Sequence, residues 1–195
     1  KVIFSKEVKF KASVEDIIKK VSKKTKIIFL ANPNNPTGTM VGSLSIESFI
    51  KSVRSDILII LDSAYAEYVD NDNYSDGAKF VEVFNNVIML RTFSKLHALA
   101  SLRLGWAYCP IEIANILKSV RAPFSVNSLA SYAGIAALKD REFQKLSVSH
   151  NAKYRAWIFN KLKQYQIDFI PSEANFFLLN FKSEEQASSA LEYLE

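Results

Sequence analysis

Lys95 is the residue whose type and surroundings point most directly to chemistry. It follows an apolar run at residues 87–90, typical of a fully buried strand, and most of its neighbours are apolar. Because burial disfavours a charged amine, this lysine is a candidate nucleophile. Thr92, Ser94 and Arg103 lie close by in sequence and are residue types that bind phosphate. An amine beside such residues suits pyridoxal phosphate, but a strand end whose lysine extends into solvent explains the stretch alone equally well.

Apolar runs and helical patterns alternate through the first half of the chain. The predicted strands cover residues 2–4, 27–31, 57–61 and 87–90. The predicted helices, the first two capped by Ser13 and Ser45, cover residues 14–21, 46–53 and 78–84. This alternation predicts βαβ units, and hence an α/β fold whose mostly parallel sheet has helices on both faces.

The polar residues that follow these strands are expected to meet. Asn35 lies in the turn after the strand at 27–31, Asp62 follows the next strand, and Lys95 follows the third. In parallel α/β sheets, ligands bind beyond the carboxyl ends of the strands. The convergence of an amide, a carboxylate and an amine at one edge therefore favours a ligand site over a solvent-exposed lysine.

The second half predicts one more strand of this sheet and then another unit. The predicted strands are residues 102–109, 167–170 and 175–179, and the predicted helices are 110–120, 128–138, 142–164 and one from 183. We therefore expect residues 1–140 to form the central part of a ligand-binding domain. Residues 141–195 are expected to form a long linking helix and the start of a smaller α+β domain.

Composition excludes several classes of protein. The 25 basic and 20 acidic residues leave a formal charge of +5, which is too mild and too spread out for a nucleic-acid surface. No apolar run approaches membrane-spanning length, so no membrane partner is expected. Cys109 is the sole cysteine, which excludes an internal disulfide and indicates a reducing, cytoplasmic compartment. The chain starts at Lys1 and ends within a helical pattern, so we expect a piece of a longer protein.

Four motifs carry a family resemblance through their order and spacing. They are Asn-Pro-Asn-Asn-Pro-Thr-Gly at 32–38, Asp-Ser-Ala-Tyr at 62–65, Thr-Phe-Ser-Lys at 92–95 and Leu-Arg-Leu-Gly at 102–105. Together they resemble the signature of fold-type I pyridoxal-phosphate aminotransferases. The sequences at 121–127 and 171–176 are most similar to those of histidinol-phosphate aminotransferases. The resemblance implies that the ligand-binding domain is the large domain of this family.

The resemblance also implies a role for each residue of the site. Lys95 would hold pyridoxal phosphate covalently and move the substrate's proton, and Asp62 would pair with the pyridine nitrogen. Tyr65 and Asn35 would hydrogen-bond the phenolic oxygen of the ring. The residues expected at the phosphate are Arg103, Thr92 and Ser94. Catalysis would rest on Lys95, Asp62 and Tyr65, and no metal is expected.

Taken singly, several of these residues have structural explanations. Asp62 can cap a turn, Tyr65 can be a core aromatic and Asn35 can be a turn former. Ser94 can simply make room beside Lys95. The set in its order is what gives the catalytic interpretation its weight.

The sequence departs from the family pattern just after Lys95, where two glycines are common. Ala98 and Ser101 stand in their places. Ala98 is expected to be a mild change, whereas Ser101 is expected to crowd a close approach of the backbone. His97, in the same segment, is expected to be structural.

Other parts of the family's site are expected outside this chain. A Gly/Ser phosphate-binding turn, an aromatic that stacks on the ring and a tyrosine from a second subunit would precede Lys1. An arginine for the substrate carboxylate would follow Glu195, because Arg121 and Arg155 are expected to be structural. The chain alone is therefore expected to be inactive.

The implied activity is transfer of an amino group from a small-molecule amino donor to a 2-oxo acid, by a homodimer when full length. Histidinol phosphate and 2-oxoglutarate, a pair from histidine biosynthesis, are expected. Another class I/II aminotransferase or a phosphothreonine-type decarboxylase would share these motifs. A non-catalytic module that senses an effector is the alternative from a different class, and a DNA-binding domain before Lys1 would favour it.

Overall fold

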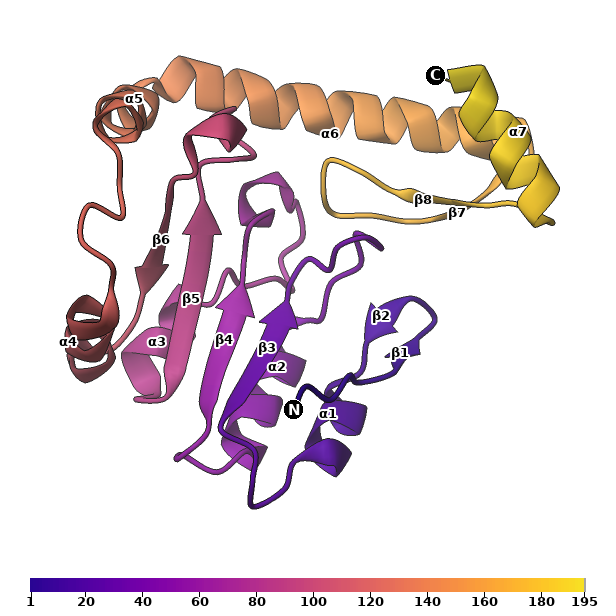
Figure 1. Cartoon of the computed structure of the whole chain (residues 1–195). Coiled ribbons are helices and arrows are strands. Elements are labelled where there is room, and N and C mark those ends of the chain that lie inside the picture. The colour runs from indigo at the N-terminus through magenta and orange to yellow at the C-terminus, as the bar shows by residue number, and fades with distance from the viewer. Residues whose placement is uncertain (195) are drawn as a thin grey trace.

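The computed structural model describes residues 1–194, and a four-stranded sheet forms the centre of this part of the chain (Figure 1). The strands, in their order across the sheet, are β3 (Ile27–Ala31), β4 (Leu58–Asp62), β5 (Val87–Thr92) and β6 (Gly105–Tyr108). β3, β4 and β5 run parallel, with Ile28 beside Ile59 and Ile60 beside Ile88. The strands predicted at residues 27–31, 57–61 and 87–90 and the mostly parallel α/β sheet are therefore confirmed.

β6 runs antiparallel to β5, with Gly105 paired to Thr92. The connecting residues 93–104, all of them described, contain only the short 3-10 helix η2 (Ala100–Leu102). Parallel neighbours need a crossover, usually through an α-helix, whereas this connection returns the chain directly. The strand predicted at 102–109 is accordingly shorter, because Leu102 still belongs to η2.

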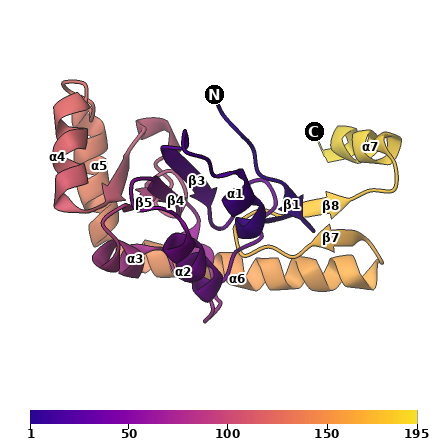
Figure 2. The same ribbon diagram turned by 90° about the horizontal axis from the view of Figure 1, so that it is seen from below.

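The main core lies between one face of the sheet and the helices α1 (Val14–Lys20), α2 (Ser43–Ser52) and α3 (Ala78–Val83). Ile46, Phe49 and Ile50 of α2 share one helix face and are almost completely buried. They pack with Leu61 and Met89 from the facing strands. Figure 2 shows α2 and α3 on the same side of the strands.

The opposite face of β3 carries exposed apolar side chains. Ile27 and Phe29 alternate with the buried Ile28 and Leu30, and they are 50% and 68% exposed. The prediction of helices on both faces therefore describes β3 less well than β4, in which Ile59, Ile60 and Leu61 are all buried. Within residues 1–194, helix cover at β3 is confined to the face that bears α1 and α2.

The predicted capping residue is correct for α1 but not for α2. The Ser13 hydroxyl accepts a hydrogen bond from the Asp16 backbone N–H at 3.1 Å, as a capping residue does. The prediction that Ser45 caps α2 is wrong, because the helix begins at Ser43. The Ser43 N–H donates to the Asn73 carbonyl at 2.7 Å, and this distant acceptor satisfies a free helix N–H in place of a side-chain cap.

The second half follows the predicted order, with α4 (Ile111–Val120), α5 (Ser128–Lys139), α6 (Arg141–Gln164), β7 (Asp168–Ile170), β8 (Leu178–Asn180) and α7 (Glu184–Leu194). The strand predicted at 175–179 is shorter and begins later than expected. Figure 1 shows α6 beyond the carboxyl ends of the parallel strands. There it packs against β7 and the 3-10 helix η1 (Ala66–Tyr68). Within residues 1–194, no helix has the length and apolar character needed to cross a membrane.

The prediction of a strand at residues 2–4 is wrong, because these residues form no strand. A small hairpin follows them in the chain. The hairpin pairs β1 (Glu7–Val8) with β2 (Lys11–Ala12). Lys9 and Phe10 form its turn with φ of 51° and 63°. Glycine or asparagine usually occupies such positions, so a Lys-Phe pair carries no hairpin signal in the sequence.

Ala98 lies in the connection between β5 and β6 with φ of 55°. A Cβ in this left-handed region costs about 1–2 kcal/mol because it approaches a carbonyl oxygen. The replacement of glycine by alanine there is therefore a larger change than the sequence suggests.

Phe49→Ala should reduce the free energy of unfolding by about 3–5 kcal/mol, because Phe49 is 1% exposed at the centre of the core. The matched control is Leu44→Ala on the same helix, where the side chain is 74% exposed. The control should change stability by no more than about 0.5 kcal/mol. Urea unfolding of both variants measures the difference, and equal losses would contradict the assignment of this face to the core.

Ala98→Gly should increase the free energy of unfolding by roughly 0.5–1 kcal/mol. Removing the Cβ relieves the strain of the left-handed backbone in the folded state, and this gain outweighs the larger conformational entropy that glycine gives to the unfolded chain. Ala136→Gly, on the exposed side of α5, should instead lower stability by about 1 kcal/mol. Thermal unfolding of the two variants should therefore show shifts of opposite sign. A loss of stability in both would contradict the strain at Ala98.

Candidate functional site

The turn after β3 is fixed by the side chain of Asn32, which is 2% exposed. Its amide donates to the Val41 carbonyl at 3.1 Å, and its oxygen accepts from the Val41 N–H at 2.8 Å. The Tyr74 hydroxyl donates to the Asn32 carbonyl at 2.8 Å. Burial raises the pKa of Tyr74 well above its ordinary value, so this phenol stays a donor. These bonds fix the turn that carries Asn35.

Asn35, Tyr65 and Lys95 come together as predicted. The Asn35 side-chain amide donates to the Tyr65 hydroxyl at 2.9 Å. The Tyr65 ring is buried and meets the Phe176 ring edge-on, with the centroids 4.9 Å apart. The Lys95 Nζ lies 5.1 Å from the centroid of the Tyr65 ring. The phenol accepts a hydrogen bond from Asn35, which leaves its own proton for donation to a ligand.

Asp62 and Thr92 are the last residues of β4 and β5. One Asp62 carboxylate oxygen accepts from the Ala64 N–H at 3.2 Å, so the residue also closes a turn, as its structural explanation predicts. The Thr92 hydroxyl accepts from the Ser94 N–H at 3.0 Å. Both bonds orient polar side chains at the carboxyl edge of the sheet.

Arg103 approaches from the connection between β5 and β6. Its backbone has φ of 55°, and its guanidinium donates to the Ala100 carbonyl at 2.7 Å. The side chain remains exposed, so its charge is available to an anion.

One cavity of about 460 Å³ gathers the whole predicted set. Every predicted site residue lines it, namely Asn35, Asp62, Tyr65, Thr92, Ser94, Lys95 and Arg103. Arg91 also lines it and is absent from the sequence-based set. An arginine near the end of an otherwise apolar strand was the available signal, because a buried charge needs a partner.

The other residues considered from sequence lie outside this cavity. The His97 ring packs on Phe93 with the centroids 4.8 Å apart, and burial lowers the pKa of the imidazole. Arg155 donates to the carbonyls of Tyr68 and Ala174 at 3.3 and 3.4 Å, in agreement with a structural role. Arg121 is exposed at the end of α4. Among residues 1–194, no three His, Cys, Asp or Glu side chains are grouped as a metal site.

The segment between β7 and β8 meets the turn after β3. The Glu173 N–H donates to the Gly38 carbonyl at 2.8 Å, and Gly38 has φ of 70°. A Cβ on Gly38 would collide with the side chain of Ser172. Residues far apart in sequence therefore share one wall next to the site.

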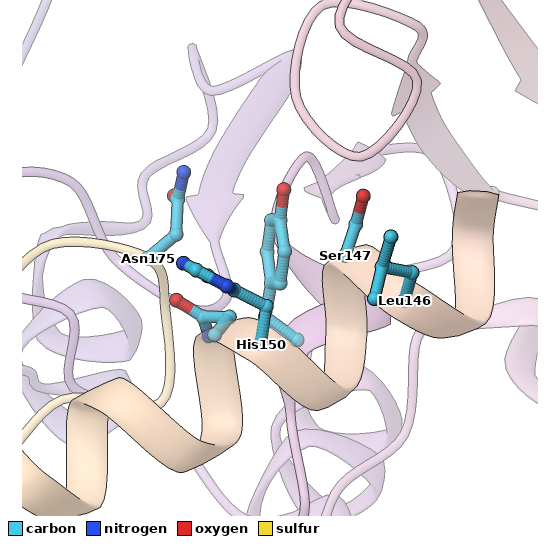
Figure 3. A pocket seen from close by; sticks show the side chains of 6 residues that line it. Leu146, Ser147, His150 and Asn175 are labelled. Atoms are coloured by element: carbon cyan, nitrogen blue, oxygen red, sulfur yellow. The ribbon is translucent and has the colours of Figure 1, made fainter.

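A second cavity of about 460 Å³ lies against α6. Figure 3 shows Leu146, Ser147 and His150 from α6 and Asn175 from the segment before β8 around it. Of the described residues that line it, none is Lys, Arg, Asp or Glu and none belongs to the predicted set. The cavity at the sheet edge, which has an amine, a carboxylate and guanidinium groups, is therefore the candidate active site.

Comparison with known proteins agrees with this geometry. Residues 1–194 match the family Aminotransferase class I and II. The chain is 46% identical over 181 residues to histidinol-phosphate aminotransferase of Pelagibacter ubique, covering 93% of this chain and 50% of that protein. It is 43% identical over 175 residues to the enzyme of the same name from Paramagnetospirillum magneticum, covering 90% and 48%.

A solved structure has the same fold. Histidinol-phosphate aminotransferase from Sinorhizobium meliloti in complex with pyridoxal-5'-phosphate superposes with a TM-score of 0.84 at 26% identity, covering 93% of this chain and 50% of that one. The chain thus spans about half the length of the curated relatives it matches. Because the family match covers every described residue, the chain belongs to the class I and II aminotransferases.

Proposed function

We propose that the protein containing this chain is a pyridoxal-phosphate-dependent aminotransferase, and that the cavity at the sheet edge holds the cofactor. The observation that carries the proposal is that the cavity collects all seven predicted residues. The Sinorhizobium meliloti structure, whose title includes pyridoxal-5'-phosphate, supports the choice of cofactor.

The ring end of the cofactor fits the residues around Lys95. The Lys95 amine would bind the aldehyde carbon, and Asp62 is the acidic residue of the cavity lining that would pair with the pyridine nitrogen. Tyr65, held by Asn35 at 2.9 Å, would donate its free proton to the phenolic oxygen. The carboxylate, amine and phenol thus correspond to the three polar positions of the ring.

The phosphate end fits the side of the cavity formed by Thr92, Ser94 and Arg103. The Thr92 hydroxyl accepts from a backbone N–H, so its own proton can be donated to a phosphate oxygen. Arg103 supplies a charged fork, which binds phosphate better than a lysine does. Residues outside this chain would complete the phosphate site.

The chain's residues would divide the chemistry among them. When bound, the cofactor supplies a conjugated ring that takes up the electrons released as the substrate's Cα–H bond breaks. The substrate's amine would displace Lys95 from the aldehyde carbon, and the freed Lys95 amine would accept that proton and return it at the former aldehyde carbon. Asp62 would keep the pyridine nitrogen protonated, and Tyr65 would orient the ring.

Histidinol phosphate as amino donor and 2-oxoglutarate as acceptor are part of the proposal. The names of relatives that are 46% and 43% identical support the donor. We also propose a cytoplasmic homodimer in which residues 1–140 belong to the cofactor-binding domain. Residues 141–195 would begin the small domain, whose contact with Gly38 joins it to the site. The intact protein should release glutamate when it is supplied with both substrates.

Lys95 should carry the cofactor in the intact protein. Borohydride reduction followed by peptide mass mapping should place a pyridoxyl group on Lys95, because this amine lies beside Tyr65 within the cavity. Lys79, whose amine donates to Ser43 at 2.6 Å, is the internal control and should stay unlabelled. Label on Lys79 or on no lysine would refute the assignment.

Asp62→Asn should leave the fold intact, because the amide oxygen can still accept the Ala64 N–H. It should lower kcat on the order of a hundred- to a thousand-fold, since the half-buried charge partner of the cofactor is lost. Asp168→Asn, on an exposed position of β7, should change kcat little. Steady-state glutamate release compares the variants, and near-normal turnover in Asp62→Asn would contradict the role of the carboxylate.

A further inference from the structure

Arg91, which lines the cavity of the candidate active site, forms two ion pairs. One guanidinium nitrogen lies 2.8 Å from a carboxylate oxygen of Glu67, and the other lies 2.9 Å from Asp76. The side chains of Arg91 and Glu67 are only 14% and 17% exposed. The Trp106 ring, with its centroid 5.9 Å from the guanidinium carbon, covers Arg91 from the neighbouring strand. Arg91 is therefore held from three directions.

The two acidic partners hold the segments that carry Tyr65 and Asp62. Glu67 belongs to η1, whose Tyr68 N–H donates to the Tyr65 carbonyl at 3.1 Å. The Asp76 carbonyl accepts from the hydroxyl of Ser63 at 2.6 Å, and Ser63 directly follows Asp62. Arg91 is therefore connected, through Glu67 and Asp76, to Tyr65 and Asp62, two of the residues proposed at the ring end of the cofactor.

The charge balance argues against Arg91 as an anion-binding residue. One guanidinium faces two carboxylates, so the group of Arg91, Glu67 and Asp76 carries a net negative charge. The Nε atom of Arg91 is buried and has no hydrogen-bond partner among the described residues. Both terminal nitrogens are already engaged, whereas Arg103 remains exposed for a phosphate. Arg91 lines the cavity, but its charge is compensated.

We propose that Arg91 is a positioning residue that fixes Tyr65 through Glu67 and Asp62 through Asp76. The inference rests on the proposed function, because the ring contacts of Tyr65 and Asp62 belong to it. Lysine would be a poor substitute, since a single ammonium cannot present two diverging donors with the geometry of a guanidinium. A displacement of about 1 Å in a catalytic group can lower the rate about 100-fold.

The test uses Arg91→Gln, Arg91→Lys and Glu67→Gln in the intact protein. Arg54→Gln is the matched control, because Arg54 forms a surface ion pair with Asp56 at 2.9 Å, away from the cavity. Hydrogen exchange of the peptide containing η1 is measured without cofactor. With pyridoxal phosphate bound, the absorbance of the cofactor is followed as the pH is varied, and the pH at the midpoint of its change is recorded. This absorbance midpoint and kcat/KM are compared with those of Tyr65→Phe.

Arg91→Gln should accelerate exchange in η1 and lower kcat/KM by about 100-fold. It should move the absorbance midpoint in the same direction as Tyr65→Phe does. Glu67→Gln should do the same to a smaller extent, Arg91→Lys should recover only part of the loss, and Arg54→Gln should match the wild type. If Arg91→Gln fails to fold, Glu67→Gln and Arg91→Lys decide the question by the same criteria.

Unchanged η1 exchange and an unchanged midpoint in the folded variants would overturn the positioning role, whatever happens to kcat/KM. Failure of the wild-type protein to bind pyridoxal phosphate is a separate result. It would refute the proposed function, while the exchange measurement would still report whether Arg91 holds η1.

Discussion

In-register parallel pairing of β3, β4 and β5 is the constraint on which the site depends. Ala31 lies beside Asp62, and Asp62 lies beside Leu90, so the strands end at nearly the same level. The polar residues that follow leave the sheet together and enclose one cavity. A slip of one residue would turn every side chain to the other face, which would expose core residues and remove Asp62 from the cavity. Core packing and site geometry thus depend on one register.

Much of the fold and the site is predictable because strand and site follow from the same rule. A strand buried on both faces needs a continuous apolar run, and the polar residues after it must lie at the sheet edge. Asp62 and Lys95 are found in this way, and the cavity contains both. Arg103 is a candidate because it follows Lys95 closely in the sequence. Tyr65 is found only through the family motifs, because composition and periodicity do not distinguish a site tyrosine from any other.

The features that sequence does not predict depend on contacts between distant residues. The direction of β6 follows from its pairing along β5, and α2 starts early because the Asn73 carbonyl accepts its first N–H. The proposed role of Arg91 depends on its ion pairs with Glu67 and Asp76, which lie on separate segments of the chain. Local propensity carries no information about such partners. These contacts nevertheless determine where the predicted residues point.

Gly38 and Ser172 limit the substitutions that each position can accept, because their atoms are in close contact. Ser172 is 4% exposed, and its hydroxyl accepts from the Ala174 N–H at 3.0 Å, so it cannot rotate away without losing that bond. Gly38 has no side chain to withdraw, and its positive φ already disfavours any other residue. Neither position can gain an atom unless the other changes as well. Among related sequences, the two positions should therefore vary as a pair or not at all, although 133 residues separate them along the chain.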